Sequence, residues 1–259
     1  MYYFHLGKWL LIAVFVFVLF NKGISQETVQ NKIDNSDLYS LIEKNYGSNP
    51  VAINGIYHED YYRNAIGHPF LNENQFVTGY VVIHNKRFDD IQLKYNVYNQ
   101  NIVIRHDTGV GNPLEIIPPN EFISEFRING RLFRKYRDET GKEKFFQVVH
   151  DGSVKCLFYW SKERTDSFHD TRMLSYRFNE EVRKSYMIIN HNLLRFKSKG
   201  NFFNLFPAKY KPELITFCRK EAINPVKSAD AALGKLIGYY EKLIDADHTG
   251  SPGKPDRTN

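Results

Sequence analysis

The stretch Ile91–Val97 (IQLKYNV) decides the fold class of this chain. Apolar and polar side chains alternate strictly through it, so an extended strand here has one apolar face and one polar face. The polar run Asn99–Asn101 then turns the chain, and Ile102 and Ile104 resume the alternation. This pattern predicts a β-hairpin that is buried on one side and wet on the other.

Shorter runs of the same character lie on both sides of this hairpin. They cover residues 52–58, 79–84, 122–128, 131–136, 145–150 and 154–160. Asn129-Gly130 and Asp151-Gly152 suit tight hairpin turns, because Asn or Asp followed by Gly accepts a positive φ at low cost. The 20 Phe and 17 Tyr residues also favour strands, since aromatic side chains suit a pleated, half-buried surface. We therefore expect an antiparallel meander that forms a curved or barrel-like sheet.

The pattern changes after this region. Residues 161–173 are polar and charged, which predicts a loop or an excursion at the sheet edge. Past Gly200 the spacing becomes helical, with Pro212 suited to the first turn of one helix and Ser228 suited to cap a second. The expected fold class is mainly β, with a C-terminal helical segment.

An apolar run near the N-terminus predicts export. Residues 9–20 carry no charge, Lys8 precedes them, and the small residues Gly23 and Ser25 follow. A short apolar core with a basic start and small residues near a cleavage site is typical of a secretory signal peptide. The alternative is an uncleaved anchor, for which the run is short. We expect an exported protein of the periplasm, the cell surface or the extracellular space, without a transmembrane span after signal removal.

These patterns together predict the domain organisation. The expected segments are a signal peptide (1–25), a polar lead-in with a short helix (26–50), a β-rich domain (51–200), a helical segment packed on it (201–244) and a disordered tail (245–259).

The charge balance argues against nucleic acid as a partner. Removing residues 1–25 lowers the net charge from +6 to +4, a surplus that suits a solvated surface. One segment, 195–220, holds seven Lys or Arg residues against one Glu and is interleaved with aromatic residues. It indicates either the two sides of a strand-to-helix passage or a site for an anionic partner, such as an envelope polysaccharide or a lipid headgroup.

The candidate catalytic residue is His68, in Gly67-His68-Pro69-Phe70. Glycine and proline fix the backbone there, so the imidazole is either an acid–base or binding group at a rigid corner or part of an ordinary turn. Other histidines stand beside carboxylates along the chain: His58, His106, His150 and His169. Adjacent strand residues point to opposite faces, so sequence adjacency does not make these pairs dyads.

No metal and no cofactor are expected. No spacing supports a metal site among His58, His68, His84 and His106. Serine-hydrolase elbows and phosphate-binding loops are missing from the sequence. The two cysteines, Cys156 and Cys218, allow either one disulfide in an oxidising compartment or two buried thiols.

Several motifs together resemble a known group. They are Gly67-His68-Pro69-Phe70, Gly79-Tyr80-Val81, Leu93-Lys94-Tyr95-Asn96, the Asp151-Gly152 turn and the pattern Leu-x-x-Leu-Ile-x-Tyr-Tyr-Glu-x-Leu at 233–243. The chain resembles exported proteins of unknown activity that are common in Bacteroidota. Many members have Tyr-Asp where this chain has Tyr95-Asn96. The resemblance implies a signal peptide, a β-rich body and a helical end, and it transfers no catalytic residue.

These observations favour a non-enzymatic binding or envelope-associated module, whose partner is a protein or an envelope glycan. Tyr- and Phe-rich strands suit a cavity or a flat aromatic face. The alternatives are a hydrolase acting on an envelope or extracellular substrate, with a histidine and a carboxylate converging from distant strands, and an accessory subunit of an outer-membrane or secretion assembly.

Overall fold

A computed structural model describes residues 55–107, 112–169 and 173–249. The predictions for the signal peptide and for the polar lead-in with its short helix lie outside these ranges. Of the tail predicted to be disordered (245–259), residues 245–249 are helical instead and belong to the last helix, and residues 250–259 lie outside the described ranges. The strands are β1 (Ile56–Tyr57), β2 (Val77–Ile83), β3 (Lys86–Asn96), β4 (Asn101–His106), β5 (Leu114–Ile117), β6 (Ile123–Ile128), β7 (Arg131–Arg137), β8 (Glu143–Asp151), β9 (Lys155–Ser161), β10 (Arg164–His169), β11 (Met173–Phe178), β12 (Val182–Ile189) and β13 (Asn192–Phe196). The helices are α4 (Lys199–Asn204), α5 (Lys211–Lys220) and α6 (Asp230–Thr249), with short 3-10 turns η1 (Asn120–Phe122) and η2 (Ala208–Tyr210).

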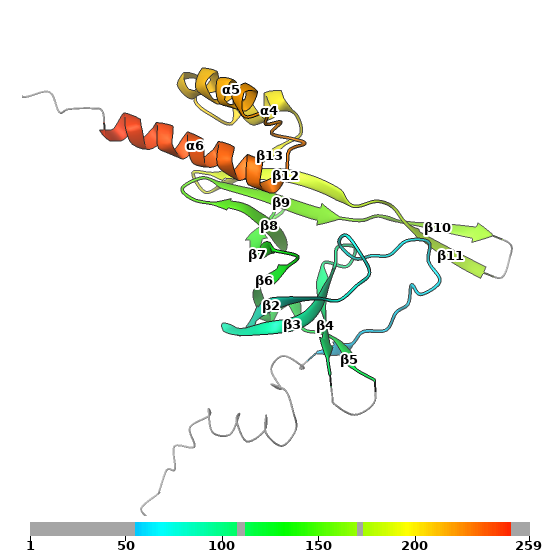
Figure 1. Ribbon diagram of the computed structural model, residues 1–259. Coiled ribbons are helices and arrows are strands. Elements are labelled where there is room, and N and C mark those ends of the chain that lie inside the picture. Colours follow the sequence, from blue (N-terminus) through cyan, green and yellow to red (C-terminus); the bar gives the residue numbers. More distant parts are fainter. Residues whose placement is uncertain (1–54, 108–111, 170–172, 250–259) are drawn as a thin grey trace, which may run out of the picture. The chain divides into compact units, whose positions relative to one another are not determined.

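Eleven strands form one antiparallel sheet, in the order β1-β5-β4-β3-β2-β6-β7-β8-β9-β12-β13 (Figure 1). The predicted hairpin is β3–β4, with Leu93 opposite Ile104 and Tyr95 opposite Ile102. Its polar side is not wet throughout as predicted, because Lys94 and Asn96 are buried. Because β1 and β13 are the two ends of the order, the sheet is open. The predicted fold class, an antiparallel meander with C-terminal helices, is confirmed.

The loop predicted over residues 161–173 is an ordered ribbon instead. β10 lies within that range and pairs with β11 in a separate two-stranded sheet. The Asn179 N–H donates to the Glu163 carbonyl at 3.0 Å, so the ribbon continues the β9–β12 pair (Figure 1). The β10 sequence RTDSFH contains one apolar residue, Phe168, so no hydrophobic alternation marks this strand in the sequence.

The first hydrophobic core is enclosed by the strands themselves. We call it the strand core, and its central side chains are Tyr95, Phe126, Phe133 and Phe145. The Phe126 and Phe133 rings stack at 4.8 Å between centroids, and Tyr95 meets both edge-on. β2 approaches β6 so closely that a Cβ on Gly79 would lie 2.1 Å from the Arg127 carbonyl oxygen, so only glycine fits there. The pairing of β2 with β3 shifts register beside this glycine, a feature that bends strands.

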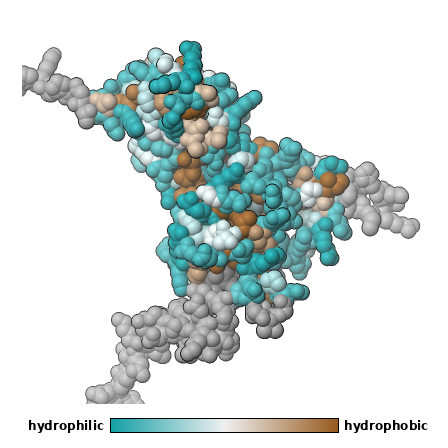
Figure 2. All heavy atoms as spheres, viewed as in Figure 1, coloured by the Kyte–Doolittle hydropathy of each residue, from teal (hydrophilic) through white to brown (hydrophobic). Residues whose placement is uncertain are grey.

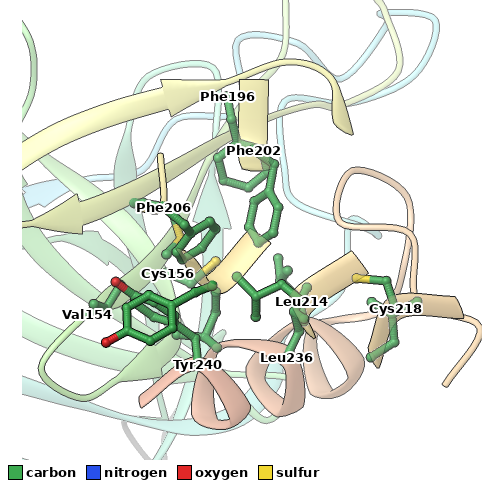
Figure 3. Packing of buried hydrophobic residues seen from close by; sticks show 14 of the residues in the cluster. Val154, Cys156, Phe196, Phe202, Phe206, Leu214, Cys218, Leu236 and Tyr240 are labelled. Carbon is green, nitrogen blue, oxygen red and sulfur yellow. The ribbon is translucent and has the colours of Figure 1, made fainter. Parts of the chain in front are cut away.

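The second core lies between the other half of the sheet and the helices. We call it the helix core; Figure 3 shows Cys156 of β9 and Phe196 of β13 packed with Phe202, Leu214, Leu236 and Tyr240 of the helices. In α6, Leu233, Leu236, Ile237 and Tyr240 recur at three- and four-residue spacings, which places one apolar stripe against the sheet. Cys156 and Cys218 are both buried and free.

Trp160 joins the two cores, since it packs against both. Its indole N–H donates to the Gln147 side-chain oxygen at 2.8 Å. The Gln147 amide in turn donates to Asp230, at the start of α6, at 2.5 Å. The buried Gln147 side chain therefore has a hydrogen-bond partner for both its oxygen and its nitrogen. These bonds link the start of α6 to Trp160, between the two apolar cores.

Charged and polar side chains form a ladder across the outer face of the sheet. The Arg87 guanidinium lies over the Tyr80 ring, the Tyr80 hydroxyl donates to Glu125, and Arg134 bridges Glu125 to Asp151. Lys155 pairs with Asp151 and completes the series. The ladder crosses β3, β2, β6, β7, β8 and β9, so it covers the polar face of the first half and ends in the second.

Candidate functional site

His68 is held by backbone and lacks a catalytic partner among the described residues. Its Nδ1 accepts a hydrogen bond from the Phe70 N–H at 3.2 Å, and its own carbonyl accepts one from Lys162 Nζ at 3.1 Å. Burial, followed by the nearby Lys162 charge, lowers the pKa of the ring. No carboxylate in the described ranges hydrogen-bonds to the imidazole, so of the two interpretations of Gly67–Phe70 the geometry supports the ordinary turn.

The other sequence candidates are dispersed. His58 faces Glu115 at 4.0 Å and meets the Phe70 ring edge-on, and burial lowers its pKa. His84 lies in the β2–β3 turn with a φ of 50° and stacks on Phe122. His106 ends β4 and His169 ends β10. Across the described part of the chain, no three His, Cys, Asp or Glu side chains lie close enough to hold a metal ion.

His150 has a close carboxylate partner, which comes from α6 rather than from the neighbouring Asp151. Its Nε2 lies 2.7 Å from Glu241, which also accepts the Ser153 hydroxyl at 2.8 Å and the Val154 N–H at 3.0 Å. Burial alone would raise the pKa of Glu241, but these hydrogen bonds together lower it. The cluster ties the β8–β9 turn to the last helix, a structural role.

This cluster also explains the Asp151-Gly152 motif. The predicted tight turn with a positive φ at the glycine is not what the structure shows: Asp151 pairs with Lys155, which leaves a three-residue loop, and Gly152 is absent from the residues with positive φ. A Cβ on Gly152 would lie 2.2 Å from the Glu241 carboxylate. The glycine is needed for the approach of the helix rather than for its backbone conformation.

Lys94 is the most unusual buried charge in the described residues. Its ammonium group donates to Asn74 at 3.1 Å and lies over the rings of Phe70 and Phe76, at 4.2 and 4.3 Å from their centroids. Burial lowers its pKa. Cation–π contacts of this kind stabilise a desolvated cation, so Lys94 binds the segment 70–76 to β3.

A cluster of aromatic and aliphatic side chains lies on the second half of the sheet. We call it the aromatic face: the buried Phe146, Leu157 and Tyr186, surrounded by the partly exposed Tyr136, Val148, Tyr159, Ile188 and Leu193. On β9, Cys156 and Phe158 point to the helix core, so Leu157 and Tyr159 point to the opposite side. All members of this cluster come from strands, and no described helix contributes to it.

The rings of the aromatic face are arranged side by side. Phe146 meets Tyr136 and Tyr186 edge-on and lies 5.6 Å from Tyr159 between ring centroids. Burial raises the pKa of Tyr159 and of Tyr186, so both hydroxyl groups stay protonated at neutral pH and can donate hydrogen bonds.

Cations border this surface. Lys144 lies 5.2 Å and Lys184 lies 5.8 Å from the centroid of the Tyr159 ring. Lys144 is paired with Asp138 at 2.7 Å, whereas Lys184 and Arg195 bind no carboxylate among the described residues. The aromatic face therefore combines half-exposed tyrosines with two cations that are available to an anionic ligand.

The sequence indicated an aromatic surface without locating it. The apolar runs in β8 and β9 are nearly continuous, so each strand has apolar side chains on both faces, and the position of the helices decides which face is covered. On the face drawn in Figure 2, hydrophilic residues predominate and hydrophobic ones form small separate patches.

Comparison with known proteins gives no further guide to the site, because the chain matches no family model, no curated protein and no solved structure. None of the helices in the described ranges is long and apolar enough to cross a membrane.

Proposed function

We propose that the chain is an exported, non-enzymatic binding module that recognises an acidic glycan of the cell envelope through the aromatic face. The observation that carries this proposal is the cluster of Tyr136, Tyr159 and Tyr186 on a sheet surface to which no described helix contributes. The proposal that the protein is exported rests on the apolar N-terminal run, and the resemblance to exported Bacteroidota proteins supports it.

The chemistry of the surface fits a sugar polymer. A sugar ring presents C–H groups on its faces and hydroxyl groups around its rim. Tyrosine rings offer an apolar face together with a polar tip, so they suit partners that are apolar in one direction and hydrated in another. The surface spans five neighbouring strands, β7, β8, β9, β12 and β13, which suits an extended chain better than a small enclosed ligand.

The border of the surface favours an acidic polymer over a neutral one. Lys184 and Arg195 add positive charge beside the rings without a bonded carboxylate in the described ranges. Attraction between these cations and uronate or phosphate groups would add affinity that falls as salt rises. The alternatives of a hydrolase and of an accessory subunit gain no specific observation from the geometry.

The test is whether the purified full chain binds polygalacturonate, with neutral dextran as the comparison. Binding is measured by affinity electrophoresis and by calorimetry. We expect polygalacturonate to bind and dextran to bind at least tenfold more weakly. The variants Tyr159→Ala and Lys184→Glu should each weaken binding at least tenfold, because central aromatic and charged contacts dominate such surfaces.

The matched control is Tyr61→Ala, which removes an exposed tyrosine outside the aromatic face. It should leave binding unchanged. Equal loss in Tyr61→Ala and Tyr159→Ala, or absence of binding to any acidic polymer tested, would overturn the proposal.

A further inference from the structure

A cavity lies away from the aromatic face, between α4 and the C-terminal end of α5. It has a volume of about 430 Å³, and its lining includes Lys199, Phe203, Ile215, Cys218, Arg219 and Ile223. Volumes of this size are typical of small-molecule sites. The cavity falls within the basic, aromatic stretch that the sequence singled out as a strand-to-helix passage or an anion site.

The floor of this cavity is apolar. Cys218 and Ile223 are buried members of the helix core, and Phe203 packs against that core from its edge (Figure 3 labels Cys218). Burial raises the pKa of the Cys218 thiol to about 11, so the sulfur is an uncharged part of the floor at neutral pH. An apolar chain entering the cavity would therefore meet hydrophobic side chains continuous with the core.

The rim is cationic. Lys199 is the first residue of α4 and Arg219 lies in the last turn of α5, and both are exposed. Two other exposed lysines of the helical segment are paired with carboxylates: Lys209 binds Asp247 and Lys235 binds Glu221, each at 2.5 Å. Lys199 and Arg219 bind no carboxylate among the described residues, so two positive charges stand together at the mouth of an apolar cavity.

We propose that this cavity binds a single-chain amphiphile with an anionic head group. The head lies between Lys199 and Arg219, and the hydrocarbon chain lies against Phe203, Ile215 and Ile223. The shared chemistry is a carboxylate or phosphate on a linear alkyl chain, as in a fatty acid or a lysophospholipid. This site is independent of the aromatic face, and its occupancy needs no glycan.

Cys218 supplies a direct reporter of occupancy in the purified full chain. Cys156 is 0% exposed and Cys218 is 8% exposed and lines the cavity, so a small thiol reagent should modify Cys218 first. Dodecanoate and dodecyl phosphate, each below its micelle concentration, should slow this modification at least tenfold. Dodecyltrimethylammonium, which has the same chain with a cationic head, should give no protection, because the rim repels it.

Chain length tests the apolar floor separately from the rim. Each methylene group moved from water into an apolar site is worth about 0.8 kcal/mol, so the Kd for alkyl carboxylates should fall by up to about fourfold per added methylene until the cavity is filled. Calorimetric titration of hexanoate, octanoate and dodecanoate measures this series and does not depend on the reactivity of Cys218.

Charge reversal at the rim provides the matched variants. Lys199→Glu combined with Arg219→Glu should weaken dodecanoate binding at least tenfold, whereas Lys220→Glu, an exposed change on the same helix turn outside the cavity, should change it less than twofold. Both positions are exposed, so folding is preserved and thermal unfolding checks it. A larger loss for dodecyl phosphate than for dodecanoate would assign the site to phosphate-headed lipids, and the reverse to fatty acids.

Three results would overturn the proposal: absence of calorimetric binding and protection with every anionic amphiphile, equal protection by dodecyltrimethylammonium, or equal loss in Lys220→Glu. Binding of polygalacturonate by the same preparation shows that the protein is folded and active at its other surface, so failure of this proposal and failure of the glycan proposal are distinguishable.

Discussion

The two halves of the sheet bury their side chains in different ways. In the half from β2 to β7 the strands curve around Tyr95, Phe126 and Phe133, and no helix takes part in this core among the described residues. In the half formed by β8, β9, β12 and β13, one face is covered by α4, α5 and α6. A meander of uniform appearance in the sequence thus forms a self-enclosed core at one end and a two-layer core at the other.

The outer faces differ in the same way. The first half covers its outer face with the ladder of Tyr80, Glu125 and Arg134, in which each polar group has a partner. The second half instead has the half-exposed Tyr159 there, beside Lys184 and Arg195, which bind no carboxylate among the described residues. Antiparallel sheets commonly keep one polar face toward water, so the second half departs from this pattern at the surface for which we propose a ligand.

The largest effects should come from substitutions that remove a buried side chain from each core in turn, and they test whether the two cores differ. Phe126→Ala in the strand core and Phe202→Ala in the helix core should each lower the free energy of unfolding by about 3–5 kcal/mol, the usual cost of emptying a buried phenylalanine site. Both residues are 0% exposed. Because Trp160 packs against both cores, we expect one cooperative transition in denaturant for the wild type and for both variants.

Phe126→Leu and Phe202→Leu serve as controls and should lose less, since they keep most of the apolar volume. Two separate transitions, one sensitive to each substitution, would show that the halves fold as independent units.

A smaller effect is expected from the carboxylate that joins the helical layer to the β8–β9 turn. Glu241→Gln should destabilise the protein by about 1–3 kcal/mol near neutral pH, because it weakens the hydrogen bonds to His150, Ser153 and Val154. The folded state lowers the pKa of Glu241 from its ordinary value of 4.5. Its contribution is therefore complete above that value and is lost as the pH falls through the lowered pKa.

Unfolding measured from about pH 7 to about pH 3 should show the wild type and Glu241→Gln converging at the acid end. Glu221→Gln is the matched control, because Glu221 is a half-buried carboxylate whose partner is the exposed Lys235, and its loss should matter much less. A difference between wild type and Glu241→Gln that stays constant with pH would contradict this assignment.

The smallest effect concerns the ladder of the first half. Arg134→Gln removes the bridge between Glu125 and Asp151. The Arg134 side chain is 37% exposed, so solvent screening limits the expected loss to about 1 kcal/mol, and added salt should reduce it further. A loss as large as that of Phe126→Ala in the same denaturation assay would mean that the ladder, rather than the strand core, stabilises the first half.

Much of the fold could be predicted because local signals and the final structure agree. Ile91–Val97 has the right period for its strand, and Asn129-Gly130 adopts the expected positive φ values of 51° and 74°. Two other hairpin turns, His84-Asn85 and Asn190-His191, also have positive φ values but lack the glycine that usually indicates them. The sequence therefore offered His84 as a possible metal ligand, whereas His191-Asn192 is expected near a hairpin turn.

The candidate sites were harder to predict because they depend on distant partners. Glu241 accepts a hydrogen bond from the Val154 N–H, 87 positions earlier in the chain. No local sequence pattern around either residue predicts this contact. The cavity beside Cys218 was foreshadowed by its basic and aromatic residues, but only the packing of α4 against the end of α5 separates its apolar floor from its charged rim.

The position of Glu241 on the last described helix also sets an order in which the molecule can be completed. The last buried residue of the strand core is Phe145, so a chain that emerges with its N-terminus first can close that core while its C-terminal part is still missing. The β8–β9 turn lacks its hydrogen bonds to Glu241 until the last described helix has been synthesised. The thiols of Cys156 and Cys218 stay accessible to solvent until the helices pack against the sheet. During emergence, the second half of the sheet is the vulnerable part, and its thiols are the groups that oxidation would reach first.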